Sequence, residues 1–368
     1  MTRRSPTVLL DIYGRAEIYT KATWGTPDER CCTVWHLPGY VDWTIINDDA
    51  VNMPGWTRTI VVLAPLVAAC SGGKTNSVTP TPVPGQPTPA PTPTPTPIPS
   101  LVATLVGAGD IADCGNDGGA HAEATAKLLD RMDGVVFTAG DNAYFDATTL
   151  DYQNCYAPRW GRHRSRTYPS PGNHEYQVSA APYFSYFGER AGPQGSGFYS
   201  YTLGNWHIVS LNSNIAMISP GSEQYVWLQN DLQANKSSST ARCTLAYWHH
   251  PHFTSGPSAG SNGMMANLWK LLYDFGVDVV VNGHDHLYER FAPQDVTGRR
   301  DTLGIAEYVV GTGGAPLYDF GPTAPNSLFK LKTYGVLKLT LRDVGWDSVF
   351  VEAGTEAQLD FSVNNLCH

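Results

Sequence analysis

Residues 283–290 of the chain read Gly283-His284-Asp285-His286-Leu287-Tyr288-Glu289-Arg290 and follow the apolar run Val277-Asp278-Val279-Val280-Val281. A β-branched run of this length is typical of a buried strand. Gly283 ends it, so both histidines fall on the loop at its carboxyl end, the edge where open α/β sheets bind ligands. Side chains two residues apart on an extended backbone point the same way, so both imidazoles can face one pocket.

Other predicted strands end in side chains of the same chemical kind, mostly beside a glycine that lets the backbone turn. Carboxylates, amides and imidazoles are oxygen and nitrogen ligands for divalent or trivalent metals. Because they recur on several separate loops, they predict a metal site at one edge of the fold. The predicted ligands are Asp110, Asp141, Asn173, His249, His284 and His286.

The alternation of strands and helices from residue 101 onward predicts an α/β domain over residues 101–368. The helical spacing predicts helices over 120–132, 222–234 and 262–275. The predicted strands cover 101–108, 134–138, 198–203, 206–211, 243–248, 277–281, 305–310, 334–341 and 348–353. A further short strand before the loop at 169–175 has no bounds that the pattern defines.

Composition excludes some classes of protein. The chain has 368 residues, and its 42% hydrophobic content is ordinary for a protein with a packed core. A formal net charge of −9 argues against a nucleic-acid-binding patch and against non-specific binding to acidic membranes. It does not exclude a phosphate substrate, because bound metal ions would set the local field.

The first seventy residues resemble an extension followed by an export signal. Residues 53–70 have a charged start, the apolar run 60–69 and the ending Ala68-Ala69-Cys70, which resembles a bacterial lipoprotein signal with Cys70 lipidated. Met53 is then the expected start, and residues 1–52 are a non-native or disordered extension. A buried helix with a chance cysteine is the alternative. The signal predicts an extracytoplasmic protein that is lipid-anchored to a bacterial membrane through Cys70.

Residues 71–100 are predicted to be a disordered tether, because the Thr-Pro repeats from residue 79 onward adopt extended polyproline II and cannot form a core. A ligand for a proline-binding domain is the rival interpretation, which suits cytoplasmic proteins better. The four cysteines beyond the tether predict two disulfides. Three pairings are possible, and we favour Cys114–Cys155 with Cys243–Cys367 because the first two lie on loops of the same half.

Taken in order, the motifs Gly-Asp, Gly-Asp-x-x-Tyr, Gly-Asn-His-Glu, His-x-Pro and Gly-His-x-His resemble those of the calcineurin-like metallophosphoesterases. Tyr144 and the Gly-His-x-His-x-Tyr-Glu-Arg ending are closer to the purple acid phosphatase branch. The resemblance covers about residues 101–353. It implies a four-layer α/β/β/α metallophosphoesterase sandwich with mixed sheets and a dimetal site at the strand ends.

The resemblance also implies two sets of ligands that share Asp141. The first metal would be held by Asp110, Asp141, Tyr144 and His286, and the second by Asp141, Asn173, His249 and His284. Where some members carry a histidine two residues after the first aspartate, this chain has Ala112. Tyr144 as a phenolate suits ferric iron, which predicts Fe(III) with Zn, Mn or Fe(II). A packing aromatic is the alternative for Tyr144.

The implied reaction is attack of a metal-activated hydroxide on a phosphate ester, with Asp141, His174 and His252 as catalytic residues. His174 resembles the family's substrate-side histidine and would stabilise the transition state or protonate the leaving group. Glu175 would orient a ligand or His174. His252 is a substrate-facing candidate against a plain surface histidine, and His250 is expected to be structural. Glu289 and Arg290 are expected to pair with each other beneath the loop rather than to contact substrate.

The main hypothesis is therefore a phosphomonoesterase acting on small-molecule phosphate esters. The alternatives are a phosphodiesterase for cyclic nucleotides or phospholipid head groups, and an inactive surface binding protein. The loops 145–168, 188–197 and 254–262 would decide between the two esterases. The sequence leaves the oligomeric state open.

Overall fold

The computed structural model describes residues 7–10, 16–19, 102–193, 195–238, 241–258 and 262–368. The chain divides into two units, residues 1–90 and 91–368. In the first unit, strands β1 (Thr7–Leu10) and β2 (Ala16–Tyr19) pair antiparallel, which the sequence pattern did not predict. The predicted signal (53–70) and the predicted tether (71–100) lie outside the described residues. That residues 1–52 are a non-native or disordered extension stays a prediction.

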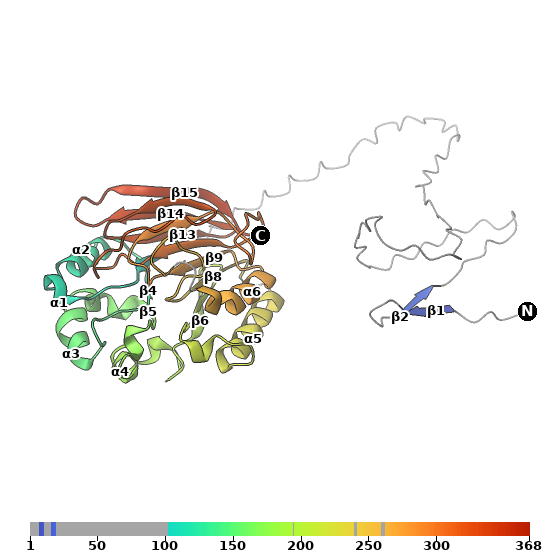
Figure 1. The fold of residues 1–368 in the computed structure, drawn as a ribbon, viewed down its shortest axis with the longest axis horizontal. Helices are drawn as coiled ribbons and strands as arrows, with labels where there is room; N and C mark the ends of the chain where they lie inside the picture. The colour runs from blue at the N-terminus through green and yellow to red at the C-terminus, as the bar shows by residue number, and fades with distance from the viewer. Residues whose placement is uncertain (1–6, 11–15, 20–101, 194, 239–240, 259–261) are drawn as a thin grey trace, which may run out of the picture. The chain divides into compact units, whose positions relative to one another are not determined.

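The second unit contains two mixed sheets (Figure 1). The first has seven strands in the order β12-β10-β11-β9-β8-β7-β6. Strands β11, β9, β8 and β7 are parallel to one another, and β10, β12 and β6 join antiparallel. Its strands are β6 (Tyr199–Leu203), β7 (Trp206–Ser210), β8 (Cys243–Tyr247), β9 (Val279–Asn282), β10 (Tyr288–Phe291), β11 (Ala306–Val310) and β12 (Ser327–Leu331).

The second sheet has six strands in the order β15-β14-β13-β3-β4-β5. Strands β3, β4 and β5 are parallel, whereas β13, β14 and β15 join antiparallel. Its strands are β3 (Ala103–Ala108), β4 (Val135–Ala139), β5 (Thr167–Ser170), β13 (Gly335–Arg342), β14 (Gly345–Glu352) and β15 (Gln358–Leu366). The sequence pattern gave no bounds for β5 and missed β10, β12 and β15.

The two-residue period of the strands separates two hydrophobic cores. On β8, Leu245 and Tyr247 face the core between the sheets, while Ala246 faces the core under the helices α5 (Glu223–Ser238) and α6 (Ala266–Asp274). On β9, Val280 likewise packs toward α5 and α6. These two helices therefore cover the outer face of the seven-stranded sheet.

Helices on the other side accompany the six-stranded sheet (Figure 1). Helix α2 (Ala120–Leu129) packs against β13 and buries Ala122, Ala126 and Leu129 in the larger core. The remaining helices are α1 (Cys114–Asp117), α3 (Thr149–Asp151) and α4 (Ala181–Phe187), with short 3-10 or π turns at Tyr152–Tyr156, Trp160–Arg166, His174–Tyr176, Gly188–Ala191, Ile215–Met217 and Asn262–Met265. The predicted α/β/β/α sandwich is confirmed.

Two disulfides join Cys114 to Cys155 and Cys243 to Cys367, as predicted. The first ties α1 to the turn after α3, and the second ties the start of β8 to the residue after β15. Each bond of this kind typically adds about 2–4 kcal/mol of stability. In the described part of the chain, no helix combines the length and the apolar character that crossing a bilayer requires.

The predicted pairing of Glu289 with Arg290 is wrong. The two residues are neighbours on β10, so their side chains point to opposite faces of the sheet. Arg290 Nε and Nη2 donate to the two carboxylate oxygens of Asp360 on β15, at 2.6 and 2.8 Å. Glu289 is fully buried on the other face and accepts hydrogen bonds from Ser255 and Ser327.

Candidate metal centre

The predicted ligands gather at the carboxyl ends of the core strands. Asp110, Asp141, His249 and His284 each lie two residues beyond the end of a strand, namely β3, β4, β8 and β9. Asn173 follows β5 by three residues. Because these strands end at neighbouring edges of the two sheets, residues far apart in the sequence meet in one cluster.

Three of these residues hold a left-handed backbone conformation. The φ angles are 59° at Asp110, 48° at Asp141 and 67° at His284. Such angles cost about 1–3 kcal/mol each outside glycine and concentrate at functional sites. Neighbouring groups stabilise these conformations. The His284 N–H donates to Asp110 Oδ2 at 2.8 Å. Gly172 packs so closely against the Asp141 carboxylate that a Cβ added at Gly172 would collide with it.

The first group of donor atoms surrounds the buried Tyr144 hydroxyl. Its oxygen lies 3.0 Å from Asp110 Oδ1, 3.2 Å from Asp141 Oδ2 and 3.2 Å from His286 Nε2. His286 Nε2 in turn lies 3.1 Å from Asp110 Oδ1. We call these four residues the phenol cluster.

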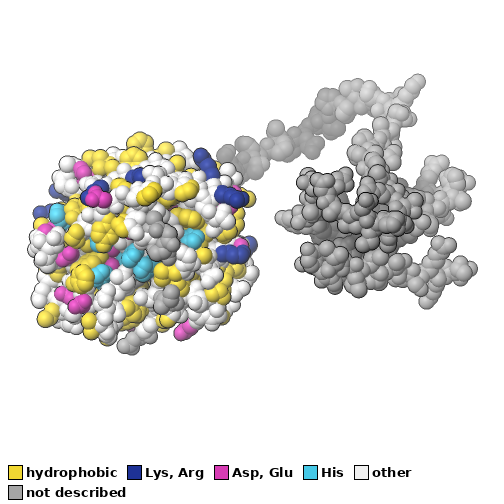
Figure 2. All heavy atoms as spheres, in the orientation of Figure 1, with side chains coloured by type: hydrophobic (Ala, Val, Ile, Leu, Met, Phe, Trp, Pro, Cys, Tyr) yellow, Lys and Arg dark blue, Asp and Glu magenta, His cyan; other side chains and the backbone are white. Residues whose placement is uncertain are grey.

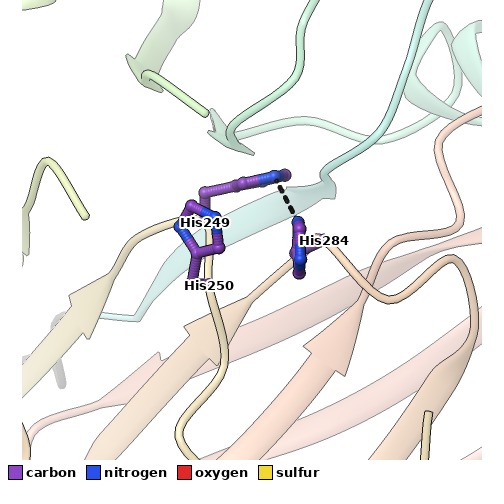
Figure 3. Close-up of side chains that lie close together, drawn as sticks. All are labelled: His249, His250 and His284. Atoms are coloured by element: carbon purple, nitrogen blue, oxygen red, sulfur yellow. Dashed lines mark hydrogen bonds between the residues drawn. The ribbon is translucent and has the colours of Figure 1, made fainter. Parts of the chain in front are cut away.

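The second group surrounds His249 Nε2. This atom lies 3.0 Å from Asn173 Oδ1, 3.1 Å from Asp141 Oδ2 and 3.2 Å from His284 Nδ1. His284 Nδ1 also lies 3.1 Å from Asn173 Oδ1. We call Asp141, Asn173, His249 and His284 the imidazole cluster; Figure 3 shows His249 and His284 converging from the loops after β8 and β9.

These spacings fit metal ligation. Nitrogen and oxygen ligands about 2.0–2.2 Å from one ion lie roughly 3–3.5 Å apart when they surround it tetrahedrally. Both clusters match that spacing, and Asp141 Oδ2 belongs to both. Buried carboxylates without lysine or arginine partners also require a compensating positive charge. The residues present therefore fit two metal ions bridged by one carboxylate.

Backbone carbonyls fix the orientation of two imidazoles. Nδ1 of His249 lies 2.9 Å from the Ala139 carbonyl oxygen, and Nδ1 of His286 lies 2.7 Å from that of Pro316. A carbonyl can only accept, so Nδ1 carries a proton and Nε2 is the ring nitrogen that faces the cluster and can ligate a metal. His284 instead turns Nδ1 toward the imidazole cluster.

The electrostatics of the centre are dominated by its carboxylates. Burial disfavours a charge on His249, but Asp141 and Asp110 outweigh it and raise the pKa of His249 to about 10. Burial and the neighbouring His249 lower the pKa of His284 to about 4. Burial, with Asp110 and Asp141, raises the pKa of Tyr144 well above its ordinary value. The site therefore favours cations.

An open pocket of about 380 Å³ lies over the centre. His174 lines it, and its Nε2 lies 3.7 Å from Asp141 Oδ2 while its Nδ1 contacts the Phe145 carbonyl oxygen at 2.6 Å. Among the described residues, the lining consists of Asp141, Asn173, His174, Pro257, Ser258, His284, Asp285, His286 and Tyr318. Two residues of the loop 254–262 thus line the pocket, and that this loop decides between the two esterases stays a prediction.

Buried Glu175 braces the loops that carry the ligands. Its carboxylate accepts hydrogen bonds from the N–H groups of Asp141, Asn142 and Gly172 at 3.0, 2.8 and 2.7 Å. Because it joins the loops after β4 and β5, it positions the bridging aspartate relative to Asn173. This placement agrees with the orienting part predicted for Glu175.

Two neighbouring histidines have different surroundings. His250 Nδ1 lies 2.8 Å from Ser213 Oγ, and burial followed by the charges of His249 and His284 lowers the pKa of His250 to about 2. Its ring still lies close to His284, as Figure 3 shows. His252 packs its ring against Phe253 and Trp269 and is absent from the described pocket lining. A catalytic part for His252 stays a prediction.

Sequence reasoning missed two residues of the pocket. Tyr318 stacks on His286, with ring centroids 4.0 Å apart and 10° between the planes. Asp285 accepts hydrogen bonds from Thr254 Oγ1 and Ser258 Oγ and so holds the 254–258 loop. The glycine-rich segment 311–314 could have indicated another site loop before Tyr318, because it directly follows β11 as Gly109, Gly140 and Gly283 directly follow their strands.

Comparison with known proteins agrees with this geometry. The family model described as calcineurin-like phosphoesterase matches residues 104–288. Purple acid phosphatase 15 of Arabidopsis thaliana is 28% identical over 226 residues, which cover 52% of this chain and 42% of that protein. Human (Homo sapiens) acid phosphatase type 7 is 27% identical over 201 residues, covering 46% of this chain and 45% of that protein.

Among solved structures, the purple acid phosphatase PPD1 from yellow lupin (Lupinus luteus) seeds has a similar fold. The TM-score is 0.54 at 21% identity, over 71% of this chain and 53% of that one. The chain therefore belongs to the calcineurin-like phosphoesterase family. Relatives named purple acid phosphatase support the purple acid phosphatase-like branch. The chain spans about half or less of the length of the curated relatives it matches.

Proposed function

We propose that the protein is a dimetal-dependent phosphoric-ester hydrolase, and specifically a phosphomonoesterase. The observation that carries the proposal is the pair of four-residue donor clusters that share Asp141 Oδ2 at the base of an open pocket. The intact donor set argues against an inactive binding protein, because each of the seven predicted ligands lies in one of the clusters.

When bound, two metal ions supply a nucleophilic hydroxide at neutral pH and neutralise charge on the phosphate oxygens. The phenol cluster, with two carboxylates and a phenol, suits Fe(III). The imidazole cluster, with one carboxylate, a neutral amide and two imidazoles, suits Zn, Mn or Fe(II). This assignment is supported by the chemistry of the donors.

His174 is the proposed general acid. Its Nδ1 is held by the Phe145 carbonyl, which leaves Nε2 on the side of Asp141 and the pocket. Because that carbonyl accepts from Nδ1–H, the acid is the imidazolium form of His174, whose second proton on Nε2 can pass to the leaving alkoxide oxygen and leave the neutral ring, as general acid catalysis requires. Asp141 contributes by holding both donor clusters together, and its Oδ1 accepts the His174 N–H at 2.9 Å, which fixes the backbone of the acid.

The test compares a monoester with a diester on the full chain loaded with iron and zinc. We expect p-nitrophenyl phosphate to be hydrolysed faster than bis(p-nitrophenyl) phosphate. A dominant diester rate would replace the monoesterase with the alternative phosphodiesterase. Absence of both activities in a sample with two bound metals per chain would favour the binding protein.

The proposed location is outside the cytoplasm, with the chain attached to a bacterial membrane through lipidated Cys70. Two disulfides support an oxidising compartment. Mass spectrometry of the native protein tests the anchor: we expect the mature chain to begin at a lipid-modified Cys70. A mature chain that begins before this residue contradicts the lipoprotein assignment.

A further inference from the structure

Tyr318 is held rigidly on the wall of the pocket. Its ring lies flat on His286, with centroids 4.0 Å apart, and its N–H donates to the His286 carbonyl oxygen at 2.9 Å. Two residues earlier, the Pro316 carbonyl binds His286 Nδ1. The segment 316–318 therefore contacts His286, a candidate metal ligand, through both its backbone and the Tyr318 side chain. These contacts leave the Tyr318 ring little freedom to move.

The same ring is partly open to solvent. Tyr318 is 37% exposed and lines the pocket. Since one face of the ring is covered by His286, the exposed part belongs to the other face and the edge. A flat, immobile aromatic surface beside a reaction centre binds a second planar group at low entropic cost, because few rotamers are lost on binding.

A second exposed aromatic residue lies next to the proposed acid. Phe145 is 68% exposed, and its ring meets His174 edge-on with centroids 4.6 Å apart. His174 is the group that would protonate the leaving oxygen, so a leaving group at that position has aromatic surface close to it. Tyr318 and Phe145 thus give the surroundings of the pocket an apolar, aromatic character beside the polar donor clusters.

Among the described residues, the lining of the pocket offers no permanently cationic side chain to a second phosphate. Neither lysine nor arginine is among the residues described as lining it, and residues 259–261, which follow Ser258, are alanine, glycine and serine. Asp285 adds a carboxylate to the lining instead. On the face drawn in Figure 2, the Lys and Arg side chains lie mainly toward the margins. A polyphosphate leaving group would lack charge compensation here.

From these observations we propose that Tyr318 is a specificity-determining residue that stacks on the leaving group. The substrate class is a phosphate monoester whose leaving group carries an uncharged planar ring. This inference rests on the proposed phosphoesterase function and adds the recognition of the leaving group. Stacking of aromatic rings is typically worth a few-fold to about tenfold in affinity.

Binding of two non-hydrolysable probes, phenylphosphonate and methylphosphonate, separates this contact from catalysis. Titration calorimetry on the full chain loaded with iron and zinc should show phenylphosphonate binding about 3- to 10-fold more tightly. Tyr318→Leu keeps apolar bulk on His286 but removes the ring; it should abolish that preference, read as the ratio of the two affinities in the same metal-loaded sample. Tyr318→Phe should retain the preference.

Phe361→Ala is the control, because Phe361 is an aromatic residue on β15 that is even more exposed than Tyr318 (67% against 37%) and is absent from the described pocket lining. It should leave both affinities unchanged. Equal affinities for the two probes in the wild type, a Tyr318→Leu variant that keeps the preference or loses both ligands equally, or a Tyr318→Phe variant that loses it would each overturn the assignment. Failure of the proposed function is a distinct result: the metal-loaded wild type would then bind neither phosphonate and hydrolyse neither ester.

Discussion

The two donor clusters differ in charge although they share an oxygen atom. The phenol cluster has Asp110, Asp141, Tyr144 and His286, while the imidazole cluster replaces a carboxylate and the phenol with Asn173 and a second imidazole. Hard anionic donors favour ions of higher charge, and imidazoles suit divalent transition metals. In the proposed function, Asp141 would therefore serve two ions of unequal charge, because its neighbours differ between the two clusters.

The largest effect should come from removing what the clusters share. Asp141→Ala takes the common Oδ2 from both, so we expect loss of both ions and a fall in kcat/KM of about 10³-fold or more, since bound metals supply several kcal/mol of transition-state stabilisation. Metal analysis and p-nitrophenyl phosphate hydrolysis measure it. Asp146→Ala, an exposed aspartate of the same loop, should retain metal and activity. Wild-type turnover in Asp141→Ala would disprove the bridge.

Breaking the imidazole cluster alone should cost less. His249→Ala removes Nε2, the atom that lies within 3.2 Å of the other three donors. We expect loss of the divalent ion and about a 10²-fold fall in activity, because the remaining ion still polarises the ester. The iron and its visible absorbance should stay. Simultaneous loss of both ions would show that the clusters do not fill separately.

Tyr144→Phe removes the hydroxyl of the phenol cluster but keeps the packing of the aromatic ring. We expect an iron-loaded sample to lose its visible absorbance, since a phenolate–iron charge transfer cannot form, with activity falling about 10- to 100-fold. The spectrum is the deciding measurement, and Tyr152→Phe provides a buried control, because Tyr152 bonds to Glu175 and not to a predicted ligand. An unchanged spectrum in Tyr144→Phe rejects the phenolate ligand.

The smallest effect is expected at His250, which borders the imidazole cluster. Ser213 Oγ already engages its Nδ1, and the structure offers His249, His250 and His284 together as a group with metal-ligand spacing. We expect His250→Asn to keep both ions and to lower activity less than about tenfold. Loss of the divalent ion in metal analysis would instead add His250 to the ligands and change the comparison between the clusters.

The strands and the donor residues could be predicted because their signal is local. An apolar run that stops at a glycine and is followed by Asp110, Asp141 or His284 reveals both the strand and the side chain beyond it. The metal-donor side chains were therefore expected to meet where the parallel strands end. The disulfides followed from even cysteine count and position, and they too were confirmed.

What could not be predicted depends on tertiary contacts. Apolar and polar residues alternate poorly along β15, so the sequence does not reveal this strand or its pairing with β14. The ion pair of Arg290 with Asp360 on β15 could not be predicted for the same reason. The expected pair of Glu289 with Arg290 does not form, because adjacent side chains on a strand point to opposite faces of the sheet. Tyr318 lies on an irregular segment, where only the position of His286 in space brings it to the pocket.

The bridging oxygen of Asp141 also has a thermodynamic consequence. Two binding events that use one atom cannot be independent, so a coupling free energy joins them. An ion held by the phenol cluster would withdraw charge from Asp141 Oδ2 and would also immobilise this atom for the other cluster. The coupling free energy can have either sign. In both cases the first ion changes the affinity for the second by the same factor as the second changes the affinity for the first. One affinity quoted without the occupancy of the other cluster therefore has no defined meaning for this protein.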